Sequence, residues 1–243
     1  ENMEIGHNVM HGQYDWMNDP TLEAAKYEWD NVAPAEEWKH GHNYIHHTYT
    51  NVIGMDRDIG YNMFRIDEDQ PWYPSHRFNL PLAFMLMLLF EWGVMYHGVE
   101  LDEYLAGRVS KEEFKARKKR AMHKIGRQVL KDYVLFPAVA LVAIAPFTTW
   151  WAPVIVLAAN VIANIIRNIW TFLIIFCGHF PAGAETFREE DAQNESRGQW
   201  YLRQLLGSAN ISGSKPFHVL SGNLSHQIEH HLFPDLPARR YRE

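Results

Sequence analysis

The stretch YVLFPAVALVAIAPFTTWWAPVIVLAANVIANIIRNIWTFLIIFC, residues 133–177, decides the fold of this chain. From Tyr133 to Ile166 it contains no Asp, Glu, Lys or Arg. We expect two apolar helices, 133–149 and 153–177, each long enough to cross a bilayer. The paired tryptophans in the connection are typical of a membrane–water interface. The sequence therefore predicts an all-α membrane helical bundle in which residues 133–177 form a transmembrane hairpin.

The polar residues on either side of the hairpin predict its orientation. Residues 110–131 form a strongly basic helix that begins at Ser110, with Glu113 three positions later as in a capping box. Lys and Arg next to a span mark its cytoplasmic side. A hairpin that begins in the cytoplasm also ends there. Residues 1–76 and 179–243 are therefore expected to form a helical cap on the cytoplasmic face, with the protein in the inner or cell membrane.

Length and composition fit one domain over residues 1–243. The chain is 47% hydrophobic, which is enough to bury a large core. Its net charge of -6 argues against nucleic acid as a partner. The first residue is Glu1 rather than Met, so we expect the natural chain to extend upstream, where a first membrane hairpin would lie.

Residues 78–98 are a further apolar stretch, interrupted by Glu91 and His97. The stretch is long enough to span a bilayer, but an acidic residue well inside a span is costly. We therefore expect one interfacial or buried helix here rather than a span.

One face of the second span carries polar residues. In lipid such groups must face a partner or a wet cavity. Two interpretations of these polar residues remain open. They could form hydrogen bonds to neighbouring helices, or they could have a role beneath a functional site. The residues are Asn160, Asn164, Arg167 and Asn168.

Three histidine clusters lie outside the hairpin. They read HNVMH at 7–11, HNYIHH at 42–47 and HQIEHH at 226–231. In each, one His stands four residues before another, which places two imidazoles on one face of a helix. The topology brings all three clusters, together with His179, to the same side of the membrane. These are too many neutral nitrogen ligands for one metal ion and about right for two.

The ligand types favour iron over most other metals. Imidazole suits iron, copper, nickel and zinc, whereas a single cysteine, Cys177, leaves thiolate zinc and iron–sulfur sites without ligands. No Glu-x-x-His pattern repeats as it does in carboxylate-bridged di-iron bundles. We therefore predict a membrane enzyme with a histidine-dominated di-iron site.

Two acidic residues follow the second cluster closely. Ring N–H groups of ligating histidines normally donate to carboxylates or carbonyls, so Asp56 and Asp58 are candidates for that role. An equally good interpretation is that both are turn residues near Gly54 and Gly60.

The clusters resemble those of a known family. GHNVMHGQ (6–13), KHGHNYIHHTYTN (39–51) and NLSHQIEHHLFPDLP (223–237) are similar to the histidine boxes of the integral-membrane fatty acid desaturases. The resemblance is greatest to the bacterial acyl-CoA branch, including the mycobacterial stearoyl-CoA type, and covers essentially the whole chain. It implies two iron ions at the cytosolic ends of a four-helix bundle, with O2 as co-substrate and no flavin or haem bound in this segment.

The resemblance also implies a set of metal ligands. The family places His or Gln three residues before the last His pair, which is Gln227 here, but His226 keeps the spacing of the second box and could serve instead. His40 could compete with His42. Four other histidines, His76, His97, His123 and His218, are expected to lie outside the site. The implied ligands are His7, His11, His42, His46, His47, His179, His226 or Gln227, His230 and His231.

The activity implied by the resemblance is oxygen-dependent desaturation of a long-chain fatty acyl substrate, as acyl-CoA or acyl-lipid. Electrons would come from a separate donor such as a ferredoxin or a reductase-linked carrier, and membrane lipid is the other expected partner. An apolar tunnel lined by the two spans and by residues 78–98 would select the carbon attacked, because an unactivated methylene can be selected only by position.

Two alternatives remain. A related di-iron enzyme could hydroxylate the alkyl chain instead. The histidines could also belong to a zinc-binding or zinc-transporting membrane protein, but a transporter should carry ionisable residues through its spans, where this chain has only Arg167 near the middle.

Overall fold

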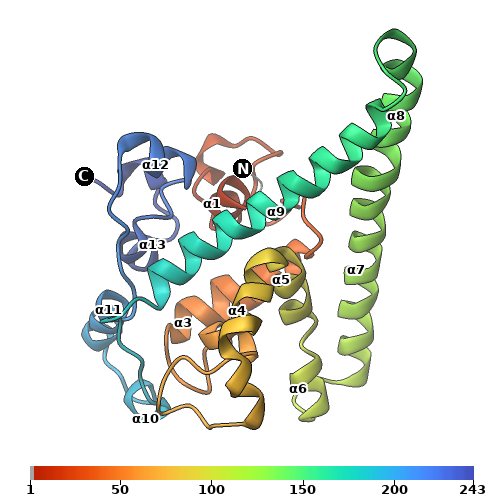
Figure 1. Ribbon diagram of the computed structural model, residues 1–243. Helices are drawn as coiled ribbons and strands as arrows, with labels where there is room; N and C mark the ends of the chain where they lie inside the picture. Colours follow the sequence, from red (N-terminus) through yellow and green to blue (C-terminus); the bar gives the residue numbers. More distant parts are fainter. Residues whose placement is uncertain (1–2) are drawn as a thin grey trace.

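The computed structural model describes residues 3–243. Within that range the chain is helical, and its only extended pairings are two isolated β-bridges. A long hairpin projects from a body of shorter helices, with both chain ends in that body (Figure 1). The α-helices are α1 Glu4–Met10, α2 Ala35–Trp38, α3 His47–Tyr49, α4 Asn79–Leu88, α5 Phe90–Val99, α6 Leu101–Leu105, α7 Lys111–Leu130, α8 Phe136–Ala143, α9 Ala152–His179, α10 Glu189–Ala192, α11 Arg197–Leu206, α12 Lys215–Leu220 and α13 Gln227–Leu232.

Two helices are long and apolar enough to cross a membrane. The first runs over Lys111–Phe147, where α7 continues through the π-helical segment η5 (Lys131–Leu135) into α8. The second is α9, with 28 residues. The basic stretch and the first span, expected as separate helices, therefore form one. The predicted all-helical membrane class is confirmed.

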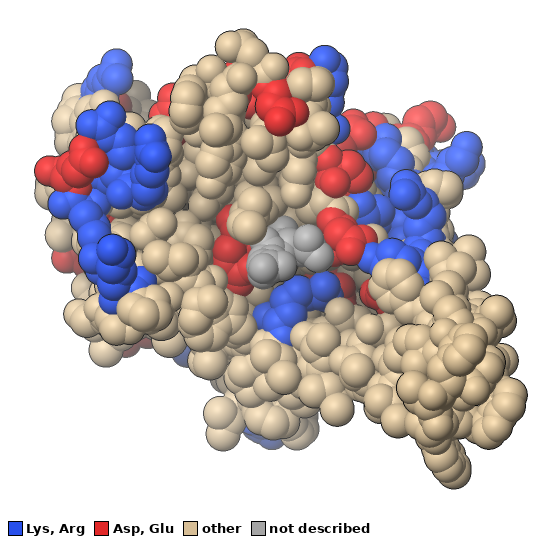
Figure 2. Space-filling model, turned by 90° about the horizontal axis from the view of Figure 1, so that it is seen from above, with Lys and Arg blue, Asp and Glu red and all other residues tan. Residues whose placement is uncertain are grey.

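The hairpin presents apolar side chains outward. At its tip Phe147 is 85% exposed and Trp150 is 73% exposed. Seen from above, the tip of the hairpin is a projection on which no charged side chain is visible (Figure 2). Such a surface suits lipid rather than water.

The polar face of α9 makes hydrogen bonds to other helices. Asn160 Nδ2 donates to the carbonyl oxygen of Asp132 over 2.5 Å, and Asn164 Nδ2 donates to the hydroxyl of Tyr133 over 2.8 Å. The other two members of this face contact the α4–α5 segment. The structure thus supports the first of the two interpretations of this polar face.

The prediction of one helix over residues 78–98 was wrong. The stretch forms two helices, α4 and α5, and the chain bends by 100° between them. At the break, Asn168 of α9 inserts its side chain. Its Nδ2 donates to Leu88 O over 3.0 Å, and its Oδ1 accepts from Glu91 N over 3.2 Å. These bonds satisfy backbone groups that the break would otherwise leave without partners.

An aromatic core holds α5 against α9 beside the histidine clusters. Phe172 and Phe176 stack with ring centroids 4.0 Å apart, and Phe90 meets Phe172 edge to face at 5.9 Å. Tyr61 stacks on Phe176 at 5.8 Å. Because these rings are buried or nearly so, they fix the C-terminal half of α9, which ends at His179.

Candidate metal centre

Four parts of the chain bring histidines together. The first pair lies on or next to α1, and the second cluster lies on the π-helical segment η2 (Lys39–His46) and the start of α3. A single His ends α9, and a pair lies on α13. Most of these rings are buried. The converging residues are His7, His11, His42, His46, His47, His179, His230 and His231.

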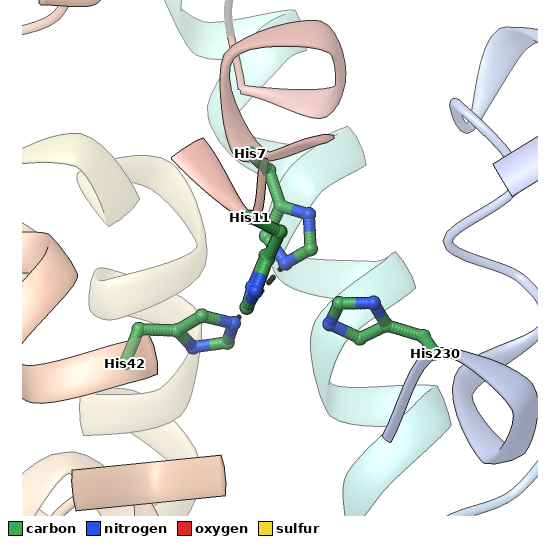
Figure 3. Close-up of side chains that lie close together, drawn as sticks. All are labelled: His7, His11, His42 and His230. Atoms are coloured by element: carbon green, nitrogen blue, oxygen red, sulfur yellow. Dashed lines mark hydrogen bonds between the residues drawn. The ribbon is translucent and has the colours of Figure 1, made fainter. Parts of the chain in front are cut away.

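The first metal-binding geometry joins His7, His11, His42 and His230. One ring nitrogen of each lies within 4.8 Å of those of the other three. Figure 3 shows the four rings pointing toward a common centre, with His7 Nε2 3.1 Å from His42 Nε2. We call this group cluster A.

The second geometry joins His46, His179 and His231, whose ligand atoms also lie within 4.8 Å of one another. We call this group cluster B. His47 stands between the two clusters, because its ring centroid is 4.8 Å from that of His230 in cluster A and 4.5 Å from that of His231 in cluster B.

The ring nitrogens of both clusters fit a bound metal. A buried polar atom without a partner costs about 1–3 kcal/mol, so seven in one place would be strongly destabilising unless a ligand satisfied them. Neutral imidazole nitrogen is a metal ligand of the kind that would do so. The unpartnered atoms are His11 Nε2, His46 Nε2, His47 Nδ1 and Nε2, His179 Nδ1, His230 Nε2 and His231 Nε2.

A largely apolar pocket lies beside the clusters. Its polar lining comes from three histidines, His7, His42 and His179, together with Glu4, Asp58 and Gln227. The rest is largely apolar and comes mainly from α5, α9 and the segments around them, including Met3, Trp38, Tyr61, Val94, Thr171, Ile174, Ile175 and Leu224. Unlike the expected tunnel, the pocket takes none of its lining from the first span.

A family model described as fatty acid desaturase matches residues 2–243. The chain belongs to the fatty acid desaturase family. It is 50% identical, over all of its 243 residues, to an NADPH-dependent stearoyl-CoA 9-desaturase of Mycobacterium tuberculosis. It is 24% identical over 235 residues to an sn-1 linoleoyl-lipid 6-desaturase of Synechocystis sp.. The family predicted from the histidine boxes is thus confirmed.

This desaturase chain spans only part of those relatives. It covers 56% of the length of the mycobacterial protein and 63% of the length of the cyanobacterial one. No solved structure matches it.

Burial favours the neutral form of most histidines in the two clusters. It lowers the pKa of His7, His11 and His47 well below the usual value, and like charges on neighbouring rings add to the effect. The pKa values of His230 and His231 are lowered for the same reasons. A metal ligand must be unprotonated at the ligating nitrogen, so this environment favours coordination.

His46 of cluster B carries its proton toward a carboxylate. Burial alone would lower its pKa, but the carboxylates of Asp56 and Asp58 raise the pKa to about 9. His46 Nδ1 lies 2.9 Å from Asp56 Oδ2, while His46 Nε2 has no partner. A pKa this high favours the doubly protonated ring, so a metal at Nε2 would displace the proton of that nitrogen while Asp56 keeps the proton at Nδ1, which is the usual arrangement of ligating histidines.

Asp58 contacts both clusters. Its Oδ2 lies 3.7 Å from His42 Nδ1 of cluster A and 3.7 Å from His46 Nδ1 of cluster B. Its Oδ1 lies 3.1 Å from Nε2 of His97, a residue expected to lie outside the site. Both acidic residues therefore contact ring nitrogens, and the turn glycines Gly54 and Gly60 beside them have positive φ as well.

The third box places Gln227, rather than His226, toward the site. Gln227 lines the pocket, is buried, and its Oε1 has no partner. His226 precedes the first residue of α13 with φ -102° and ψ 65°, and its ring stacks on His218 outside both clusters. Because His226 is not helical, a spacing of four residues does not put it on the face of His230.

His40, which could have competed with His42, is exposed and stacks on Tyr44 outside both clusters. Of the histidines expected outside the site, His97 is in neither cluster but contacts Asp58, and His123 is exposed on α7. His76 bonds locally to Tyr73 N. His218 is buried but is bonded through both ring nitrogens, to Ser225 and Gly213.

The sequence analysis did not predict several contacts that other side chains make with the cluster histidines. His231 Nδ1 lies 3.2 Å from Thr50 Oγ1 and 3.1 Å from Gln204 Oε1. His230 Nδ1 lies 3.3 Å from the Tyr241 hydroxyl. Only Thr50 lies inside a quoted box, and no spacing rule connects the other two to the site.

The contact between Asp56 and His46 gives a first testable expectation. An Asp56→Asn variant keeps the shape of the side chain but loses its charge, and should bind metal about 10–100-fold more weakly. Metal titration of the apoprotein measures this. Asp30→Asn, which weakens an ion pair to Lys131 and belongs to neither cluster, should leave the affinity unchanged. Equal affinities for Asp56→Asn and the wild type would contradict the role of Asp56.

Proposed function

We propose that this chain belongs to an oxygen-dependent fatty acyl desaturase whose histidine clusters hold two iron ions. The observation that carries the proposal is the presence of two groups of converging imidazoles, most of them with a buried ring nitrogen that has no partner, beside an apolar pocket that His7, His42 and His179 help to line. The relative named stearoyl-CoA 9-desaturase supports a long-chain acyl-CoA as substrate.

Each cluster would hold one iron ion. His7, His11, His42 and His230 are the ligands of cluster A, and His46, His179 and His231 are those of cluster B. His47 lies between the clusters and completes either set, and Gln227 Oε1 is a further oxygen ligand within reach of the pocket. When bound, the irons supply the oxygen chemistry that removes hydrogens from an alkyl chain.

The protein's own contribution is to position the substrate. A methylene offers no acidic or basic group to recognise, so the carbon attacked must be chosen by where the chain lies. The apolar wall from Val94, Ile174 and Ile175 would hold the chain, and the histidine wall would face the reacting carbons. Closure of the pocket around the chain would exclude water.

Charge supports an active site on the cytoplasmic face. The N-terminal half of the helix Lys111–Phe147 is basic and its C-terminal half apolar, which favours a cytoplasmic start. Exposed Lys115, Lys118 and Lys119 on α7 offer a docking surface for an acidic electron carrier. The name of the mycobacterial relative supports NADPH as the ultimate electron source.

The test is product analysis. The natural full-length protein, expressed in a host that cannot make unsaturated fatty acids, should yield a chain that has lost two hydrogens at one position. A product that has gained oxygen would contradict desaturation and favour a hydroxylase. A His123→Ala variant should behave as the wild type, because His123 is exposed on α7 and far from both clusters.

A further inference from the structure

The apolar pocket ends near a buried polar group. On α9 the pocket lining runs from Thr171 to His179, so Thr171 is the lining residue of this helix farthest from the histidine clusters. On α5 the lining residue is Val94. The next turn of each helix beyond them carries charge, with Glu91 three residues before Val94 and Arg167 four residues before Thr171. Neither charged residue lines the pocket.

Glu91 and Arg167 form an ion pair at the break between α4 and α5. Their side chains are 7% and 18% exposed. Asn168 bonds to both sides of the same break, through Leu88 O at 3.0 Å and Glu91 N at 3.2 Å. Three polar side chains are thus gathered at one place beside the aromatic core between α5 and α9.

A hydrocarbon chain cannot take the place of this group at low cost. Separating a buried ion pair leaves two uncompensated charges in an apolar surrounding, which is among the most expensive changes a protein interior can undergo. Phe90, next to Glu91 in the chain, meets Phe172 edge to face at 5.9 Å, so the ion pair is next to a packed part of the interior. A pocket floor formed by such a group would be rigid rather than deformable.

The depth of the pocket is fixed by helix geometry. Thr171 lies eight residues before His179 on α9, which corresponds to about 12 Å along the helix. This distance separates the histidine wall from the floor. It limits how much of an acyl chain can extend beyond the reacting carbons.

We propose that Glu91, Arg167 and Asn168 form a polar floor that sets the length of the acyl chain which the pocket accepts. The proposal rests on the proposed function, because it names what selects among substrates of the same site. The three residues act by closing the space beyond Thr171. They are specificity-determining residues and take no part in the chemistry.

A purely structural role of the ion pair would affect activity differently. If the ion pair only stabilised the helix bundle, its removal would lower activity for all chain lengths alike. If it forms the floor, its removal should change the preference between chain lengths. The ratio of turnover for two chain lengths separates these cases even when a variant is less stable.

The experiment compares C18 and C20 acyl-CoA with the natural full-length protein in membranes. The double variant Glu91→Ala/Arg167→Ala removes both charges together and avoids a lone buried charge. It should raise the ratio of kcat/KM for C20 over C18 at least about tenfold, since one or two methylenes in an apolar pocket are worth that much. The position of the double bond, counted from the carboxyl end, should not change.

Two further variants test the same point. The charge-swapped variant Glu91→Arg/Arg167→Glu restores an ion pair and should return the ratio toward the wild-type value. Asn164→Ala removes an interhelical hydrogen bond of the same helix to Tyr133, away from the pocket, and should leave the ratio unchanged. An unchanged ratio in the double alanine variant would overturn the proposal.

Binding gives a readout that does not depend on turnover. The shift in melting temperature produced by saturated acyl-CoA of increasing length should reach its maximum at a longer chain in the double alanine variant than in the wild type. If the wild type makes no unsaturated product, the proposed function is wrong. If the melting-temperature shift reaches its maximum at the same chain length in both proteins, the polar floor is wrong. The two failures are thereby distinguished.

Discussion

A His231→Ala variant is expected to lose one of two bound metal ions and all desaturase activity. His231 is completely buried in cluster B, and its Nε2 has no partner in the protein. Cluster B has only two other histidines, His46 and His179, so the loss of one ligand should prevent binding there. Cluster A keeps all four of its ligands. Elemental analysis should therefore show about half the metal of the wild type.

His218→Ala is the matched control for this variant. His218 is also buried, also lies in the C-terminal part of the chain, and is bonded to Ser225 and Gly213. Its replacement should lower the melting temperature without changing the metal content per folded chain. If His231→Ala kept its full metal content or its activity, His231 would not be a ligand.

An Asn51→Ala variant is expected to lose about 3–5 kcal/mol of stability, which is a large part of the total for a single domain. Asn51 is 1% exposed, and its Nδ2 lies 3.3 Å from His179 O, 3.0 Å from Glu185 O and 2.8 Å from Gly207 O. Alanine would leave these buried carbonyl oxygens without a donor, at about 1–3 kcal/mol each for those that find no other partner.

The backbone of Asn51 adds to the expected loss. Its φ is 56°, a left-handed conformation that asparagine tolerates better than alanine. Its N–H donates to Asp56 Oδ2 over 2.8 Å, which holds the carboxylate that contacts His46. The substitution should therefore loosen both the end of α9 and cluster B.

Denaturation of the purified apoprotein measures the effect of Asn51→Ala. Asn18→Ala is its control, because Asn18 also has a positive φ, 52°, but is exposed, and its side chain donates to Trp16 O in the same turn. Asn18→Ala should cost less than about 1 kcal/mol. Similar losses in the two variants would show that the buried bonds of Asn51 contribute little.

The hairpin and the gathering of histidines could be predicted from the sequence because both follow from local patterns. An uncharged stretch from Tyr133 to Ile166 is a direct signal of a membrane helix, and a His four residues before another is a direct signal of a shared helix face. Once the hairpin returns the chain to its starting side, the clusters must lie on one face.

The break at Leu89 could not be predicted, because its cause lies elsewhere in the chain. The stretch 78–98 is largely apolar, and neither Glu91 nor His97 within it marks the position of the break. What stabilises the bend is the side chain of Asn168, which lies 80 residues beyond Leu88 and replaces the missing helical hydrogen bonds. Only tertiary structure brings the two together.

The choice between His226 and Gln227 depended on where one helix begins. A boundary placed one residue earlier would put His226 on the face of His230, and sequence patterns locate helix ends only to within one or two residues. The structure begins α13 at Gln227. Contacts such as that of Gln204 with His231 likewise could not be predicted from the sequence, because they join separate helices.

The most direct test of the two-cluster site is the metal content of the purified wild-type protein, measured by elemental analysis together with Mössbauer spectroscopy of iron-57 material. We expect two iron ions per folded chain, in nitrogen-rich environments that correspond to clusters A and B. A protein that binds a single zinc ion, or that remains folded with no metal when iron is supplied, would contradict the account.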